Sequence, residues 1–186
     1  LRVSASVPFA VRHIAPLLRG FTERPPQVTL QIVASNRYVD LIDSQIDVAV
    51  RNREFEPDSA ITIRRLARTR RVLAASPAYL AAHGAITHPH DLAAHPMLVY
   101  SHANSPHELR FERGDDTLAQ PVRCLLESDD ADVLRAAALS GLGPLVLPAY
   151  ILHDDLRRGT LVPLLSDWTL PSLTINLAYA SRRHVP

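Results

Sequence analysis

The chain alternates between short apolar runs typical of β-strands and segments whose apolar residues recur at helical spacing. The strand-like runs are residues 1–6, 28–34, 46–50, 61–66, 71–75, 97–100, 122–126, 145–147, 161–165 and 173–180. The helix-like segments are residues 11–23, 39–44, 76–82, 129–140 and 148–156. This alternation predicts an α/β fold with a mainly parallel sheet covered by helices.

The strand–helix units are too many for one simple sheet, so we expect two α/β lobes. The arginine-rich residues 64–71 are the natural first crossover, and residues 166–171 are the natural return. Lobe I then comprises residues 1–70 with 171–186, and lobe II comprises residues 71–170. Within lobe II, residues 109–111 and 117–119 flank Gly114-Asp115-Asp116, a pattern typical of a β-hairpin.

Capping residues and apolar spacing add detail to three helices. Ser76 before Pro77 predicts an N-cap with proline in the first helical position, and Gly84 a terminator. Gly141 is expected to close the helix over residues 129–140. The predicted inward-facing residues of that helix are Val133, Leu134, Ala137 and Ala138. In the helix over residues 11–23 the apolar stripe is Ile14, Leu17, Leu18 and Phe21.

Composition excludes several classes of protein. The formal net charge is +1, which makes the chain a poor candidate for binding nucleic acid through phosphates. A single cysteine, Cys124, excludes an internal disulfide and a cysteine-based zinc site. No apolar run reaches the roughly 18 residues that span a membrane. The chain opens in a strand, without Met or a signal peptide, so we expect a fragment or a mature domain.

Catalytic motifs are missing from the sequence. It has no Gly-x-Ser-x-Gly elbow, and Gly141-Leu142-Gly143 lacks the third glycine of a dinucleotide site. Six of the nine histidines lie between His83 and His107, but His88, His90 and His95 fit no metal-ligand pattern and are expected to be solvated. We therefore predict no enzymatic activity, no metal and no cofactor.

Three strand-to-helix junctions, residues 4–9, 34–37 and 127–130, carry short polar side chains. In α/β sheets, ligands gather at the carboxyl ends of strands, where helix N-termini present unpaired N–H groups. Taken singly, each junction is better explained as a helix cap than as a ligand contact. Together they suit a small anionic or zwitterionic ligand, although Asp129 and Asp130, facing it, would favour an amine or a hydroxyl.

The ordered set of motifs resembles the effector-binding domain of LysR-type transcriptional regulators over essentially the whole chain. The matching stretches are residues 1–5, 17–21, 39–43, 46–51, 71–80, 91–95, 134–143, 147–148, 156–163 and 179–183. The resemblance implies a type-2 periplasmic-binding-protein fold, with two Rossmann-like lobes, two crossover strands and an effector cleft between them. It also implies that DNA binding belongs to an N-terminal winged helix-turn-helix domain that this chain lacks.

The resemblance places effector contacts at the three junctions. The implied contacts are Ser6, Pro8, Phe9, Ser35, Asn36, Ser128 and Asp129, with Tyr100, Ser101 and Pro144 as weaker candidates. Arg51 matches an arginine that either holds an effector carboxylate or pairs with an acidic neighbour. The chain departs from relatives at Pro8, Leu109 and Asp129, so the effector itself is not inherited.

The implied function is a cytoplasmic metabolite sensor that signals through rearrangement of a homodimer or homotetramer. The expected effector is an organic acid, an aromatic carboxylate or an amino acid. The helices over residues 11–23 and 129–140 are the expected contacts between copies, although a buried core face explains their apolar residues equally well. The alternative is a periplasmic solute-binding protein of the same fold.

Overall fold

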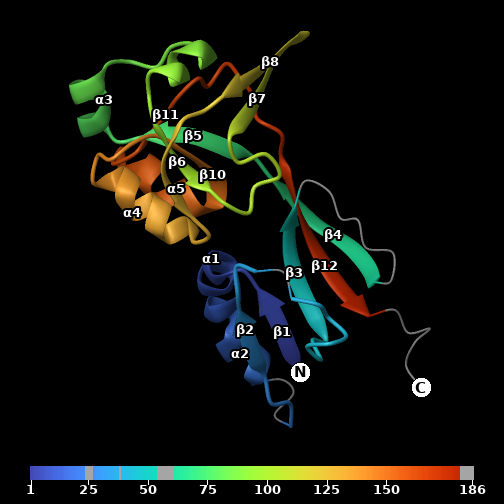
Figure 1. Cartoon of the computed structure of the whole chain (residues 1–186). Helices are drawn as coiled ribbons and strands as arrows, with labels where there is room; N and C mark the ends of the chain where they lie inside the picture. The colour runs from blue at the N-terminus through green and yellow to red at the C-terminus, as the bar shows by residue number, and fades with distance from the viewer. Residues whose placement is uncertain (24–26, 38, 54–60, 181–186) are drawn as a thin grey trace. The chain divides into compact units, whose positions relative to one another are not determined.

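The computed structural model describes residues 1–186 except 24–26, 38, 54–60 and 181–186. Internal contacts divide the chain into two compact units (Figure 1). The first unit is Leu1–Arg68 together with the segment that starts at Thr174, and the second is Thr69–Leu173. The chain therefore passes between the units twice.

The first unit is built on a five-stranded sheet with the order β2-β1-β3-β12-β4. Its strands are β1 (Arg2–Ala5), β2 (Gln31–Ala34), β3 (Val48–Arg53), β4 (Ile61–Thr69) and β12 (Leu173–Ala180). Strand β1 runs parallel to β2 and β3, whereas β12 runs antiparallel to β3. A small core of Leu41, Ile46, Ala49 and Ala178 packs in this unit.

The helical segment after β1 is irregular. It consists of α1 (Val7–Phe9), the π-helical turn η1 (Ala10–Ile14), the 3₁₀ turn η2 (Ala15–Leu17) and α2 (Leu18–Thr22). A π turn shifts the phase of a helix, so the stripe predicted from a constant helical period does not hold. Leu17 is 70% exposed and Phe21 is also exposed, so these two residues of the stripe do not belong to a buried core face.

The helix predicted over residues 39–44 is a single hydrogen-bonded turn instead. The carboxylate of Asp40 accepts hydrogen bonds from the backbone N–H groups of Ile42 and Asp43, at 2.8 and 2.9 Å. Gln45 then adopts a positive φ of 53°, which stops helical propagation. An aspartate side chain competes with helix formation in this way because it satisfies the local N–H groups itself.

The second unit holds a five-stranded mixed sheet with the order β11-β5-β10-β6-β9. Its strands are β5 (Arg71–Ala75), β6 (Met97–Tyr100), β9 (Cys124–Ser128), β10 (Leu145–Pro148) and β11 (Val162–Pro163). Strand β6 is parallel to β9 and β10, and β5 is antiparallel to β10 and β11. The unit also contains α3 (Pro77–His83), η3 (Pro89–Ala93), α4 (Ala131–Leu139), α5 (Ala149–Arg158) and the hairpin of β7 (Glu108–Arg113) and β8 (Asp116–Pro121).

Helix ends in the second unit follow the predicted capping residues. The Ser76 hydroxyl accepts a hydrogen bond from the N–H of Tyr79 at 3.2 Å, and Gly84 ends α3 with a φ of 94°. Gly141 follows α4 with a φ of 85°. Of the residues predicted to face inward from α4, Leu134 and Ala138 are fully buried, but Val133 is 51% exposed. The prediction for Val133 is therefore wrong.

The core of the second unit is mainly aliphatic and lies in two clusters. One cluster contains Leu98, Leu134, Leu145 and Leu152, and the other contains Leu92, Phe111 and Trp168. Leu109 belongs to the second cluster and is buried, so it is a core residue.

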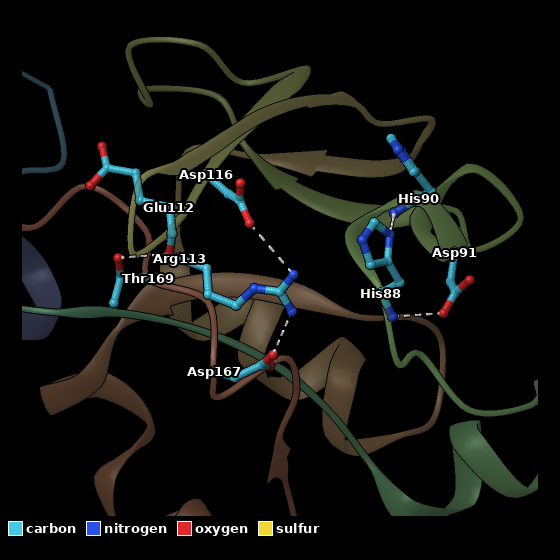
Figure 2. A network of polar contacts seen from close by, with 8 residues as sticks. All are labelled: His88, His90, Asp91, Glu112, Arg113, Asp116, Asp167 and Thr169. Carbon is cyan, nitrogen blue, oxygen red and sulfur yellow. Dashed lines mark hydrogen bonds and ion pairs between the residues drawn. The ribbon is translucent and has the colours of Figure 1, made fainter.

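The hairpin β7–β8 is fastened to the segment that leads into β12. Figure 2 shows Arg113 between two carboxylates, 3.2 Å from Asp167 and 3.8 Å from Asp116. Its guanidinium also lies 4.2 Å from the ring centroid of Trp168, within cation–π range. Glu112 and Thr169 exchange two backbone hydrogen bonds beside it, of 2.9 and 2.7 Å. These contacts hold the return segment against the hairpin.

Candidate functional site

In the first unit, two predicted site residues follow neighbouring parallel strands. Ala5 at the end of β1 pairs with Ala34 at the end of β2, so Ser6 and Ser35 leave the sheet at the same edge. The backbone N–H of Ser35 donates to the carbonyl of Ala5 at 2.9 Å. The structure therefore brings together two of the three predicted junctions.

Asn36 links these two strand ends. Its side-chain carbonyl accepts a hydrogen bond of 3.1 Å from the N–H of Val7 at the start of α1. Ser6 is the N-cap residue of α1, but its side chain makes no capping hydrogen bond. Pro8 is buried in the first turn, and the half-buried ring of Phe9 lies 4.8 Å from that of His13. Asn36 thus has the helix-capping role that the sequence predicted for each junction taken singly.

Arg51 lies at the same sheet edge. Strand β3 pairs Val50 with Ala5, so Arg51 is one residue beyond the end of β1. It is half-buried, and its guanidinium donates to the carbonyl of Val39 at 3.3 Å. The first unit thus collects two hydroxyls, an amide and a guanidinium at one edge.

In the second unit, the ends of β6 and β9 form an equivalent edge. Tyr100 pairs with Ser128, and the N–H of Ser101 donates to the carbonyl of Ser128 at 3.0 Å. The Ser128 hydroxyl accepts a hydrogen bond of 3.0 Å from the N–H of Asp130. The Tyr100 ring meets His102 edge-on at 5.8 Å between centroids. Tyr100, Ser101 and Ser128 therefore lie side by side.

The two neighbouring aspartates have different roles. Asp130 is the N-cap of α4, and its carboxylate accepts hydrogen bonds from the N–H groups of Asp132 and Val133, at 2.8 and 3.2 Å. A carboxylate at a helix N-terminus is also favoured by the helix dipole. Asp129 precedes the cap and is exposed. Only Asp129 keeps its carboxylate out of the cap, which favours it over Asp130 as a ligand contact.

Pro144 does not join the other candidates. It is fully buried immediately before β10, and its carbonyl accepts a hydrogen bond from Leu98 at 2.9 Å. Because β10 runs parallel to β6, with Leu145 opposite Leu98, Pro144 lies toward the end of the strands opposite Tyr100. Pro148, at the carboxyl end of β10 and before α5, is the proline nearer the candidate edge. The strand-end rule applied to the other junctions would have selected it.

The histidine-rich segment is only partly solvated. His95 is buried, and its Nδ1 lies 3.0 Å from the Tyr79 hydroxyl, so the prediction that it is a solvated histidine is wrong. Burial raises the pKa of Tyr79. His88 caps η3 by accepting a hydrogen bond from the N–H of His90 at 3.3 Å (Figure 2). Over the described residues, no group of three His, Cys, Asp or Glu side chains is placed to hold a metal ion.

The candidate residues place hydrogen-bonding groups at the strand ends of each unit. Within the described part of the chain, no hydrogen bond joins the hydroxyls of Ser6, Ser35 or Ser128 to a histidine, so none of these hydroxyls has a base to activate it. Hydroxyl, amide and guanidinium groups instead donate hydrogen bonds to oxygen acceptors. A membrane-spanning helix is not found among the described residues either.

Two mixed α/β units, each with polar residues at parallel strand ends, define a two-lobed domain with the periplasmic-binding-protein fold. The family model for the LysR substrate binding domain matches residues 1–186. The chain belongs to this family.

Relatives agree with this membership. The chain is 31% identical over 186 residues to the HTH-type transcriptional regulator PtxR of Pseudomonas aeruginosa, covering all of this chain and 59% of that protein. It is 33% identical over 171 residues to the regulator CrgA of Neisseria meningitidis, covering 91% of this chain and 56% of that protein. The chain thus spans little more than half the length of these relatives.

Solved structures give the same result. The CrgA regulatory domain of Neisseria meningitidis superposes with a TM-score of 0.85 at 30% identity, covering all of this chain and 91% of that one. Full-length AphB, a virulence activator of Vibrio cholerae, gives a TM-score of 0.83 at 28% identity, covering all of this chain and 63% of that one. The predicted two-lobed α/β fold is confirmed.

Proposed function

We propose that this chain is the effector-sensing part of a cytoplasmic transcriptional regulator. One small organic acid, aromatic carboxylate or amino acid contacts the polar strand ends of both units. DNA binding belongs to a winged helix-turn-helix domain outside this chain. The PtxR and CrgA relatives, both named as transcriptional regulators, favour this function over a periplasmic solute-binding protein and over an enzyme.

The observation that carries the proposal is the equivalence of the two sheet edges. Each unit has a pair of parallel strands, β1–β2 and β6–β9, followed by serines at the carboxyl ends. Arg51 adds a cation at the first edge, and Asp129 adds an exposed carboxylate at the second. A ligand with a carboxylate and a donor group, such as an amino acid, complements both charges.

A thermal-shift screen with organic acids, aromatic carboxylates and amino acids tests effector binding. A ligand at a hundred times its dissociation constant stabilises the folded chain by about 2.7 kcal/mol. Ser35→Ala and Ser128→Ala should each abolish the shift without unfolding the chain. Ser140→Ala is the matched control, because Ser140 lies at the opposite end of α4 from Ser128. An undiminished shift in both site variants would reject this site.

The effector signal is proposed to travel through contacts between copies of the chain. Val11 and Leu17, on the helical segment after β1, and Val133, on α4, are exposed apolar side chains. Their exposure removes the alternative that they belong to a core face, and burial against another copy stabilises association. An effector that binds two arrangements of the assembly with different affinity shifts their populations.

Sedimentation equilibrium tests the association. Leu17→Asp and Val133→Asp should each shift the chain toward monomer, because a buried unpaired carboxylate opposes association. Ile42→Asp is the control, since Ile42 is also exposed but lies on neither helix. A wild-type chain that stays monomeric at high concentration contradicts the pairing.

A further inference from the structure

A concentration of positive charge lies in one short segment, three of whose arginines belong to strand β4. Residues 61–71, which include β4, contain five arginines and no acidic residue. The rest of the chain has 15 arginines and 19 acidic residues, a net charge of −4. The overall charge of +1 is therefore the sum of a basic segment and an otherwise acidic chain.

Strand β4 is open on one edge and on both faces. It is the last strand of its sheet, bonded to β12 on one side (Figure 1), and no other strand of the described residues pairs with its outer edge. All six residues from 63 to 68 are exposed. An edge strand of this kind offers unpaired backbone N–H and C=O groups to an added strand.

Apolar side chains lie between the arginines. Ile63 is 37% exposed and Leu66 is 51% exposed. Because side chains alternate along a strand, Arg64, Leu66 and Arg68 share one face, and Ile63 and Arg65 share the other. Each face thus combines a cation with an apolar contact. A nucleic-acid phosphate backbone can pair only with the arginines. An acidic peptide strand can pair with the arginines, contact the apolar side chains and hydrogen-bond to the open backbone edge.

Three of the five arginines have no acidic partner in the described part of the chain. Among the described residues, no acidic side chain pairs with Arg64, Arg65 or Arg70. A second β4 strand is disfavoured as the occupant, because pairing β4 with itself brings two arginine-rich strands together with no acidic residue to offset their charge. The complementary occupant is therefore acidic and extended.

We propose that the outer edge of β4 binds an extended acidic segment of a partner protein by strand addition. Backbone hydrogen bonds along the edge supply affinity, and glutamates or aspartates opposite the arginines select the partner. The edge belongs to the first unit and uses none of the candidate effector residues. The proposed interaction is therefore separate from effector sensing. It would stand even if the effector-binding proposal were rejected.

The register of β4 specifies a probe. An antiparallel complement of residues 62–69 places Glu opposite each arginine and an apolar residue opposite Ile63, Leu66 and Ala67. The peptide is Thr-Glu-Val-Leu-Glu-Glu-Val-Thr, with blocked ends. The control peptide Thr-Lys-Val-Leu-Lys-Lys-Val-Thr has the same pattern with reversed charge. Binding of labelled peptide to this chain is measured by fluorescence anisotropy at low and high salt.

Saturable binding of the glutamate peptide is expected, weakened by salt, with at least tenfold weaker binding of the lysine peptide. Arg64→Gln combined with Arg65→Gln should weaken binding at least tenfold. Arg157→Gln with Arg158→Gln is the matched control, since both are exposed on α5, and should change binding less than twofold. Methylating alternate backbone nitrogens of the peptide gives two forms, of which one should lose binding and the other keep it.

Four outcomes overturn the proposal. The first is no saturable binding of the glutamate peptide, and the second is equal binding of the lysine peptide. The third is equal binding of both methylated forms, which indicates charge attraction without strand addition. The fourth is tighter binding of duplex DNA than of the peptide, abolished by the Arg64 and Arg65 variants, which assigns the strand to nucleic acid.

Discussion

At the residue scale, the pair of Arg135 and Asp155 joins α4 to α5 in the second unit. Asp155 accepts two hydrogen bonds from the Arg135 guanidinium, one of them 2.8 Å long, and its side chain is only 4% exposed. The hydrogen bond to Asp155 raises the pKa of Arg135. A buried ion pair is costly to break, because the remaining charge has no oppositely charged partner.

Arg135→Ala should therefore lower the free energy of unfolding by about 3 kcal/mol. Urea denaturation followed by circular dichroism measures the loss. Arg135→Met with Asp155→Leu should recover part of it, since neither charge is then buried alone. Arg157→Ala, an exposed change on α5, is the control, and an equal loss in that variant would show that the pair has no special role.

Asp91 gives the fold a dependence on acid pH. Its carboxylate accepts backbone hydrogen bonds from Thr87 and His88, both 2.8 Å, which lower its pKa. Figure 2 shows the hydrogen bond from His88. A carboxyl whose folded pKa is lowered contributes stability above its unfolded pKa of about 4 and loses it as the pH falls through the folded value. Asp91→Asn should be less stable than wild type at pH 6, with the gap narrowing toward pH 3. A gap in urea midpoint that stays constant with pH contradicts this origin.

At the element scale, Gly143 lets two segments of the second unit approach closely. A Cβ atom at this position would lie 2.9 Å from the backbone carbonyl of Pro96. Gly141 therefore ends α4, as predicted, and Gly143 permits close packing. Overpacking of a core contact costs about 1–3 kcal/mol.

Gly143→Ala should destabilise the chain by about that amount. Gly20→Ala is the matched substitution, because nothing lies within 4 Å of a Cβ at Gly20, which sits inside α2. Alanine there should stabilise by about 0.5–1 kcal/mol, since glycine weakens a helix. Thermal denaturation should show a lower melting temperature for Gly143→Ala and a higher one for Gly20→Ala. Equal changes in melting temperature would contradict the packing role of Gly143.

Elements bounded by capping or turn-forming residues were predictable from the sequence. The strands β5, β6 and β12 have the predicted boundaries, and α3 starts after Ser76 as expected. The helical phase of the segment after β1 was not predictable. A π turn shifts the helical period there, and the spacing of apolar residues does not reveal its position. The junctions after β1, β2 and β9 followed from the strand-end rule, whereas Tyr100 and Ser101 after β6 were implied by the resemblance. The contact of all these residues with an effector stays a prediction. Pro144 was selected by resemblance without applying that rule.

At the scale of the whole molecule, the two units have unequal cores. The buried clusters of the second unit include Leu98, Leu134 and Phe111, whereas the described cluster of the first has four members. Burial of apolar area is the main source of stability. Hydrogen exchange with mass spectrometry should therefore show slower exchange in β6 and β10 than in β1 and β2. Equal protection in both units would show that they unfold as one.

The order of the strands in the first sheet has a consequence for synthesis on the ribosome. Strand β12 lies between β3 and β4, although it is made last. The second unit, Thr69–Leu173, is continuous and is complete before Thr174 emerges. Since domains fold as units during translation, the later-made unit folds first. The earlier-made β1, β2 and β3 therefore cannot complete their sheet until β12 has been synthesised.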